Sequence, residues 1–145
     1  MTTTQTLPYL NTREDAAFRF LGVPTLMRST AETTNGAFGL MEHWEIPVGF
    51  ASPYHTHHRE DESFYVLEGD ITVHCGGETF PAPKGSFVFL PRGVVHDWDV
   101  DGERARVVIL AVPGGFDKFL AEWETAEDWA TRDAIGARYG ITFPR

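Results

Sequence analysis

Residues 49–62 read Gly49-Phe-Ala-Ser-Pro-Tyr-His55-Thr-His57-His-Arg-Glu-Asp-Glu62. Alternate side chains of a β-strand point to the same face, so His55 and His57 can direct their imidazoles to one point. Glu62 follows a short turn, and His96 begins a later strand after Gly85-Ser-Phe-Val-Phe-Leu-Pro91-Arg-Gly93-Val-Val. Three neutral imidazoles and one carboxylate that converge inside a β-structure make a first-row transition-metal site. Coordination positions remain open there for water, oxygen or a chelating substrate.

The segments around these two stretches predict an all-β fold. Runs rich in valine, isoleucine, leucine and aromatic residues occupy 38–46, 63–68, 71–74, 87–90 and 106–112. Glycine or proline interrupts the chain at nearly every break, including a break at Gly69-Asp70 and a hairpin turn at Gly76-Gly77. Short strands at this spacing are typical of an antiparallel sandwich or barrel.

The two ends of the chain differ from this central part. Residues 17–21 and 24–29 predict additional strands, whereas apolar residues recur at helical spacing from Phe116 to Trp123 and a second helix is expected over 127–138. We expect one domain over residues 1–145, with N-terminal strands at about 17–30, a barrel at about 36–113 and a helical appendage at about 114–145.

Composition excludes some classes of function. The chain of 145 residues carries 21 acidic against 12 basic residues, a formal charge of −9, which argues against nucleic-acid or anionic-membrane surfaces. The single cysteine, Cys75, cannot form an intramolecular disulfide, so no oxidising compartment is implied. We find no signal peptide and no apolar stretch long enough to cross a bilayer, so a cytoplasmic protein is expected.

The two histidine-containing stretches together resemble the conserved motifs of the cupins. The first has the spacing G-x5-H-x-H-x(3,4)-E-x6-G and ends at Gly69, and the second has the spacing G-x5-P-x-G-x2-H. Only the final asparagine of the longer form is missing, with Val100 in its place. Segments 36–43, 57–69, 113–119 and 137–143 further resemble small bacterial cupins described as quercetin-dioxygenase-like. The resemblance implies a single-domain jelly-roll β-barrel and, as is common in small cupins, a homodimer.

The same resemblance implies a metal-dependent dioxygenase acting on a chelating enol, phenol or flavonol-type substrate. His55, His57, Glu62 and His96 would hold one divalent Fe, Mn, Ni, Co, Cu or Zn ion, and dioxygen would be a co-substrate. In quercetin dioxygenases the glutamate ligand also takes the proton of the substrate hydroxyl, a role that falls here to Glu62. Two alternatives stay open: a redox-neutral isomerase, cyclase or lyase that uses the same metal, and a non-catalytic module that binds a small ligand.

Residues near the ligands predict the rest of the site. Phe64 and Val66 share the parity of Glu62, and Trp98 that of His96, so these three with Tyr54 are expected to form an apolar, substrate-binding wall. The alternative for each is simple core packing. Residues 87–90 are apolar on both faces, which suggests a strand covered on both sides, as in a packed dimer.

The remaining polar residues near the motif are expected to play no direct part. His58 should point away from His57, and a register shift that makes it the ligand is the alternative. His43 and His74 are expected to be ordinary surface or core histidines, and Glu60 and Asp61 to be solvated. Phe116, Phe119 and Trp123 are expected to dock the C-terminal helix on the barrel, with a pocket lid as the alternative.

Overall fold

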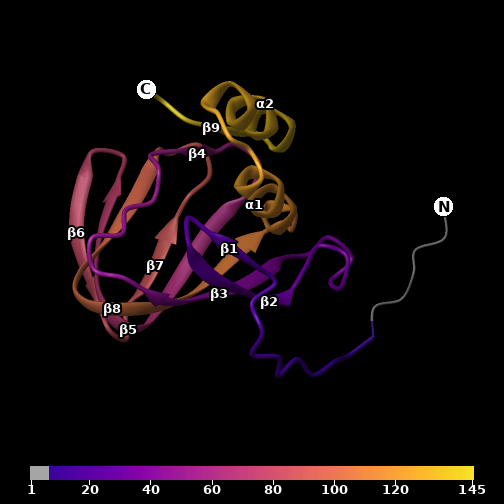
Figure 1. Ribbon diagram of the computed structural model, residues 1–145, viewed down its shortest axis with the longest axis horizontal. Coiled ribbons are helices and arrows are strands. Elements are labelled where there is room, and N and C mark those ends of the chain that lie inside the picture. The colour runs from indigo at the N-terminus through magenta and orange to yellow at the C-terminus, as the bar shows by residue number, and fades with distance from the viewer. Residues whose placement is uncertain (1–6) are drawn as a thin grey trace.

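The computed structural model describes residues 7–145 as an antiparallel β-structure with two helices near the C-terminus (Figure 1). The strands are β1 (Phe18–Phe20), β2 (Val23–Ser29), β3 (Gly39–Ile46), β4 (Thr56–His57), β5 (Asp61–Cys75), β6 (Glu78–Pro83), β7 (Phe87–Leu90), β8 (His96–Val112) and β9 (Ile141–Thr142). The helices are α1 (Phe116–Glu124) and α2 (Trp129–Tyr139). The expected segments are found as strands and helices, but β5 joins the two strands expected at 63–68 and 71–74, and β8 joins the strand that begins at His96 to the one expected at 106–112.

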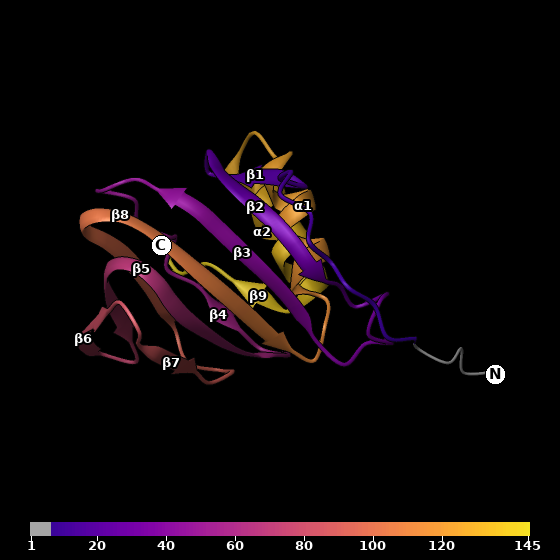
Figure 2. The same cartoon turned by 90° about the horizontal axis from the view of Figure 1, so that it is seen from below.

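Two long strands, β5 and β8, run through the whole sheet and take part in both layers of the fold. The two strands pair with each other, and the two halves of each have different further neighbours. In β5, the first half pairs with β7 and the last half pairs with β6. In β8, the first half bridges to residues 51–55 and the last half pairs with β3. Figure 2 shows the strong curvature of these strands. The result is the two-layered antiparallel jelly-roll fold, with the apolar core between the layers.

The bend in β5 occurs where the sequence predicted a break. The expected end of a strand at Gly69-Asp70 was wrong, because β5 continues through these residues with two register shifts against β8. Gly69 has a φ of 86°, and a Cβ atom there would lie 2.8 Å from Cα of Ala105. A glycine is therefore needed for the close approach of the two strands, and it produces a bulge rather than a turn.

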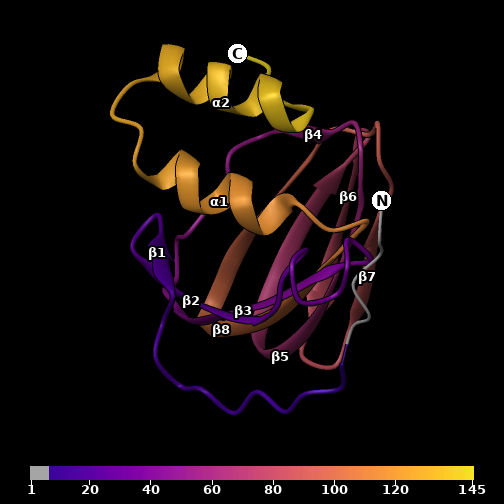
Figure 3. The same cartoon turned by 90° about the vertical axis from the view of Figure 1, so that its right-hand side faces the viewer.

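The helices cover one side of the curled sheet (Figure 3). Helix α1 contacts β1 and β3 and buries Phe116, Phe119, Leu120 and Trp123, the apolar positions that the sequence periodicity identified. Helix α2 packs on α1. Asp128 caps its N-terminus, where the side chain accepts a hydrogen bond from the Thr131 amide, and Gly140 caps its C-terminus in the left-handed conformation. Strand β9 then pairs with β4, which ties the C-terminus to the segment that carries His57.

Two further features concern the surface of the chain. Phe87 and Phe89 of β7 are 66% and 54% exposed, so the outer face of this strand is uncovered in the single chain. Of the helices in residues 7–145, neither has the length and apolar character required to span a bilayer.

Candidate metal centre

Strand pairing brings the four predicted ligands together from three places in the sequence. His55 and His96 exchange two backbone hydrogen bonds of 3.0 and 2.9 Å, so these residues lie directly opposite each other. His57 lies in β4, two residues further along, and its carbonyl oxygen accepts a hydrogen bond of 2.7 Å from the Gly93 amide. Glu62 lies near the start of β5, opposite Ala111 of β8. Residues of three strand segments therefore face one buried point.

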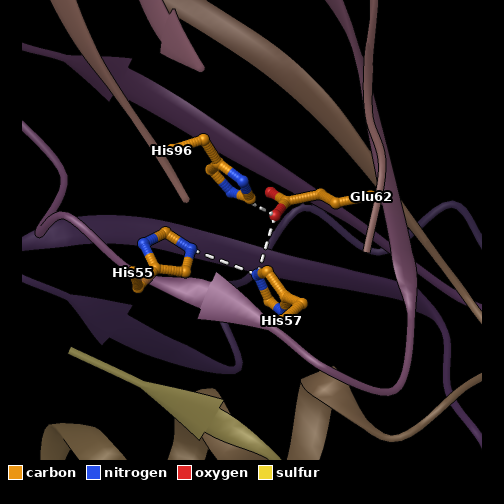
Figure 4. Close-up of side chains that lie close together, drawn as sticks. All are labelled: His55, His57, Glu62 and His96. Carbon is orange, nitrogen blue, oxygen red and sulfur yellow. Dashed lines mark hydrogen bonds and ion pairs between the residues drawn. The ribbon is translucent and has the colours of Figure 1, made fainter. Parts of the chain in front are cut away.

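The side chains of His55, His57, Glu62 and His96 converge there (Figure 4). Nε2 of His57 lies 3.1 Å from Nε2 of His55 and 2.9 Å from Oε2 of Glu62, and Nε2 of His96 lies 3.0 Å from the same carboxylate oxygen. One donor atom from each residue falls within 4.8 Å of every other. All four residues are at most 8% exposed, so these donor atoms are shielded from bulk solvent.

The second ring nitrogens of two ligands have acceptors of their own. Nδ1 of His55 donates to the carbonyl oxygen of Pro53 over 2.6 Å, and Nδ1 of His57 donates to the carboxylate of Glu60 over 2.5 Å. A proton held on Nδ1 leaves the Nε2 lone pair of each neutral ring directed at the centre. Nδ1 of His96 is buried and makes no hydrogen bond within residues 7–145. Three imidazole nitrogens and a carboxylate oxygen, buried and oriented in this way, fit a divalent first-row metal.

The electrostatics of the metal-free cluster differ from ligand to ligand. Burial, with the neighbouring His57 and His96, lowers the pKa of His55 to about 3. Burial also opposes protonation of His57, but hydrogen bonds to Glu60 and Glu62 outweigh it and raise its pKa to about 9. For Glu62, burial acts to raise the pKa, yet hydrogen bonds from His57 and His96 hold it well below its ordinary value. In the absence of a metal ion these pKa shifts favour a protonated His57 between the carboxylates of Glu60 and Glu62, beside a neutral His55.

Glu60 is a functional neighbour that the sequence analysis missed. We expected it to be solvated, and that expectation was wrong, because Glu60 is 4% exposed and bonded to His57. Asp61, by contrast, pairs with Arg92 at the surface. The signal available in the sequence was only an acidic residue three positions after a ligand, and nothing in a short turn reveals which of two consecutive acids points inward.

A small, partly open cavity of about 30 Å³ adjoins the centre, between the inner sheet face and α1. Two of the four candidate ligands line it, together with mainly aromatic side chains. The lining residues are Phe20, His43, Ser52, Pro53, His55, Glu62, Trp98, Ile109, Phe116, Phe119, Leu120, Trp123 and Phe143. The ring centroid of Phe116 lies 4.7 Å from that of His57, so α1 reaches the ligands themselves. Helix α1 is therefore both docked on the sheet and part of the cavity wall.

The four residues expected to form the substrate wall occupy different places. Trp98 lines the cavity, and Phe64 packs against Trp98 with ring centroids 6.1 Å apart. Val66 is completely buried in the core and is absent from the cavity lining. Tyr54 is 38% exposed and lies at an outer, shallow depression beside Thr142 and Phe143. The structure thus brings Trp98 to the cavity beside the ligands and leaves Tyr54 outside it.

The other histidines also differ in their surroundings. His58 is exposed and bonded to Thr142, which agrees with the expectation that it points away from the ligands. His74 lies on the outer side of the sheet, 2.7 Å from Asp97. His43 is buried and lines the cavity. It lies two residues after the buried Met41 in β3, and side chains two residues apart on a strand point to the same face, so this spacing was the signal in the sequence for an inward orientation.

Comparison with known families gives one matching model, described as a cupin domain, over residues 42–113. This span includes all four residues of the centre. Among curated proteins, the chain is 32% identical over 89 residues to quercetin 2,3-dioxygenase of Bacillus subtilis, which covers 61% of this chain and 26% of the relative. The chain thus spans about a quarter of the length of that relative.

Solved structures show the same fold. KdgF from Halomonas sp. superposes with a TM-score of 0.65 at 19% identity and covers 80% of this chain and 99% of its own. A putative sugar phosphate isomerase from Acidithiobacillus ferrooxidans is 27% identical with a TM-score of 0.51, over 61% of this chain and 59% of its own. The first of these supports the fold alone, because its sequence identity is low.

Proposed function

The chain belongs to the cupin superfamily, and from this premise we propose that it is a metal-dependent dioxygenase of small molecules. His55, His57, Glu62 and His96 would hold one divalent ion of iron, manganese, nickel, cobalt or copper. The observation that carries the proposal is the convergence of these donors beside a cavity lined mainly by aromatic side chains. The 32% identity to a quercetin 2,3-dioxygenase over 89 residues supports this choice of reaction.

The substrate in this proposal is an enol, phenol or flavonol with two adjacent oxygen atoms. A bound metal ion would supply Lewis acidity toward a chelating hydroxyl group and electron exchange with dioxygen. Both atoms of dioxygen enter the product and the substrate supplies the electrons, so no external reductant is required. Trp98, with Phe64 behind it, would face the flat part of the substrate. Val66 supports that wall from the core, and Tyr54 would meet only an exposed part of a ligand.

Glu62 would accept the proton of the substrate hydroxyl. In the metal-free chain its carboxylate is a weak base because His57 and His96 donate hydrogen bonds to it. When the Nε2 atoms of these histidines serve as ligands they carry no proton, so both hydrogen bonds to Glu62 are lost and a carboxylate oxygen is free to accept a proton from the substrate, which the bound metal ion would make more acidic. Buried apolar walls then exclude water, which keeps the proton on Glu62 until it is returned to the product.

Oxygen uptake tests this reaction. Metal-free protein is loaded separately with each of the five ions and with zinc, and oxygen consumption is measured with 3-hydroxyflavone as substrate. We expect one dioxygen consumed for each substrate with at least one redox-active ion, no uptake with zinc, and loss of uptake in Glu62→Gln. Glu103→Gln, at an exposed position of β8, is the matched control and should behave as wild type. No oxygen uptake with any ion would contradict the proposal.

A redox-neutral isomerase is the second candidate. The 27% identity to a putative sugar phosphate isomerase favours it, since a metal centre of this type also polarises carbonyl groups without oxygen. Conversion of a hydroxy-carbonyl compound under anaerobic conditions, equally fast with zinc, would support this candidate over the dioxygenase.

We also propose that the chain forms a homodimer through the outer face of β7. The support is the exposure of Phe87 and Phe89 on a short edge strand, where uncovered aromatic side chains are unfavourable in a monomer. Sedimentation equilibrium should give twice the chain mass, and a Phe87→Glu, Phe89→Glu double variant should give the monomer. A monomeric wild type would contradict this proposal.

A further inference from the structure

His43 is a buried histidine of the cavity that the metal centre does not use. It lies in β3, is 2% exposed, and its ring stacks on Phe20 with centroids 5.9 Å apart. It lines the same cavity as His55 and Glu62. The open space there is about 30 Å³, smaller than a benzene ring needs, so a ring-sized substrate that touches both the ligand pair and the His43 ring must displace lining side chains.

Only one nitrogen of His43 has a protein partner. Nδ1 lies 2.8 Å from the hydroxyl oxygen of Thr25, which is itself 3.3 Å from the carbonyl oxygen of Val23. Nε2 makes no hydrogen bond to any residue between 7 and 145. If Thr25 donates to Val23, Nε2 of His43 is an acceptor, and if Thr25 donates to Nδ1, Nε2 is a donor. In both cases Nε2 is left without a partner among residues 7–145, and a ligand in the cavity that His43 lines can provide one.

The rest of the cavity wall restricts what that ligand can be. No lysine or arginine of the described chain lines the cavity, so away from the metal centre no side chain would balance the charge of a phosphate or carboxylate. The hydroxyl oxygen of Ser52 accepts a hydrogen bond from the Trp98 amide over 3.0 Å, and its O–H group is an uncharged donor. Trp123 adds an uncharged indole N–H, which also lacks a partner in residues 7–145. The other lining side chains are mostly aromatic rings.

We propose that this cavity binds an uncharged aromatic molecule and that the imidazole of His43 hydrogen-bonds a hydroxyl group of that molecule, apart from the group that reaches the metal centre. A hydroxyl group matches either state of Nε2, because it can donate or accept. His43 is then a residue that determines substrate specificity. The inference rests on the proposed function only in taking this cavity to be the substrate site.

The ionisation of His43 agrees with this role. Burial lowers the pKa of His43 to about 4, against a smaller opposing effect of Glu62. At neutral pH the ring is therefore uncharged, and it offers no attraction to an anion.

The test uses phenol and toluene, which differ by a hydroxyl in place of a methyl group. Binding is measured by ¹⁵N NMR on chelator-treated protein, so that coordination to a metal does not contribute. Replacing His43 by Phe keeps the ring and removes the nitrogens. We expect the affinity for phenol to fall about three- to tenfold in His43→Phe, as for loss of one neutral hydrogen bond, with toluene affinity unchanged. Benzoate should bind more weakly than phenol to the wild type.

Two controls separate recognition from folding. His74→Phe makes the same substitution on the outer side of the sheet and should leave both affinities unchanged. His43→Gln keeps a polar atom and should retain most of the phenol affinity. In the wild type, phenol should shift the imidazole ¹⁵N resonances of His43 and toluene should not, a result that needs no variant. Three results would overturn the proposal: no binding of phenol, no shift of the His43 imidazole ¹⁵N resonances with phenol, or equal losses of affinity for phenol and toluene in His43→Phe. Because the protein is metal-free, failure of the oxygen-uptake reaction would leave this result unaffected.

Discussion

The carboxylate of Glu60 lies 2.5 Å from Nδ1 of His57, on the side of the imidazole that faces away from Glu62. His57 is therefore held between two carboxylates, one at each ring nitrogen. The partner at Nδ1 fixes which nitrogen carries a proton and how the ring is turned, and an acidic partner also makes Nε2 a better electron donor. Glu60 thus belongs to the candidate centre as a positioning residue, although it contributes no ligand atom.

We predict that Glu60→Gln weakens metal binding by about 10- to 100-fold, the usual effect of removing such a partner of a histidine ligand. Competition with a chromophoric chelator measures the affinity directly. Asp61→Asn is the matched control, because Asp61 is the adjacent acid but pairs with Arg92 at the surface. Equal affinities for Glu60→Gln and wild type would show that the contact with His57 does not orient the ligand.

Proton release should accompany metal binding. His57 has a pKa raised to about 9 in the metal-free protein, above the ordinary value of 6.5, so at pH 7 it carries a proton on Nε2 that the metal must replace. His55, with a pKa lowered to about 3, has none to release. We expect His57 to release about one proton at pH 7 and less as the pH rises through 9. Calorimetry in buffers of different ionisation enthalpy counts these protons, and release that does not change between pH 7 and 10 would contradict the assignment.

The same pKa shift affects the stability of the metal-free protein. A histidine whose folded pKa is raised stabilises the fold fully below its unfolded value, and this contribution is lost as the pH rises through the folded value. The His57 contribution therefore falls between about pH 6.5 and 9. Thermal unfolding of chelator-treated protein should show this decrease, and Glu60→Gln should reduce it. Metal-loaded protein should lack it, because the proton is already gone.

The four residues of the candidate centre could be predicted from the sequence in two steps. Strand parity, a local property, places His55 and His57 on one face of a strand and Trp98 on the face of His96. The expectation that Glu62 and His96 come from other strands to the same point followed from the resemblance to the cupin motifs, and the structure brings the four side chains together.

Residues whose role depends on distant contacts were not found. Glu60 is inward only because the turn after His57 folds beneath the imidazole, and Tyr54 is outside only because the segment at 51–55 bridges to β8. The continuation of β5 past Gly69 depends on contact with Ala105, which is far along the chain. Local patterns give a glycine the same appearance in a turn and in a bulge.

Gly69 and Gly85 provide a test of the bulge. Both have a φ near 90°, yet a Cβ atom at Gly69 would lie 2.8 Å from Cα of Ala105, whereas nothing lies within 4 Å at Gly85. Gly85→Ala should lower the free energy of unfolding by about 1–2 kcal/mol from backbone strain alone. Gly69→Ala carries the same strain and a backbone clash, so we expect a clearly larger loss in urea unfolding. Equal losses would mean that the approach of β5 to β8 does not require glycine.

The most direct measurement for the whole account is the metal content of the purified protein, prepared without added metal or a metal-binding tag. Elemental analysis should give about one equivalent of iron, manganese, nickel, cobalt or copper per chain in the wild type, and almost none in His55→Ala, His96→Ala. Phe87→Glu retains the centre and should keep its metal. A wild type that contains no metal and takes up none on titration would contradict the assignment of this centre.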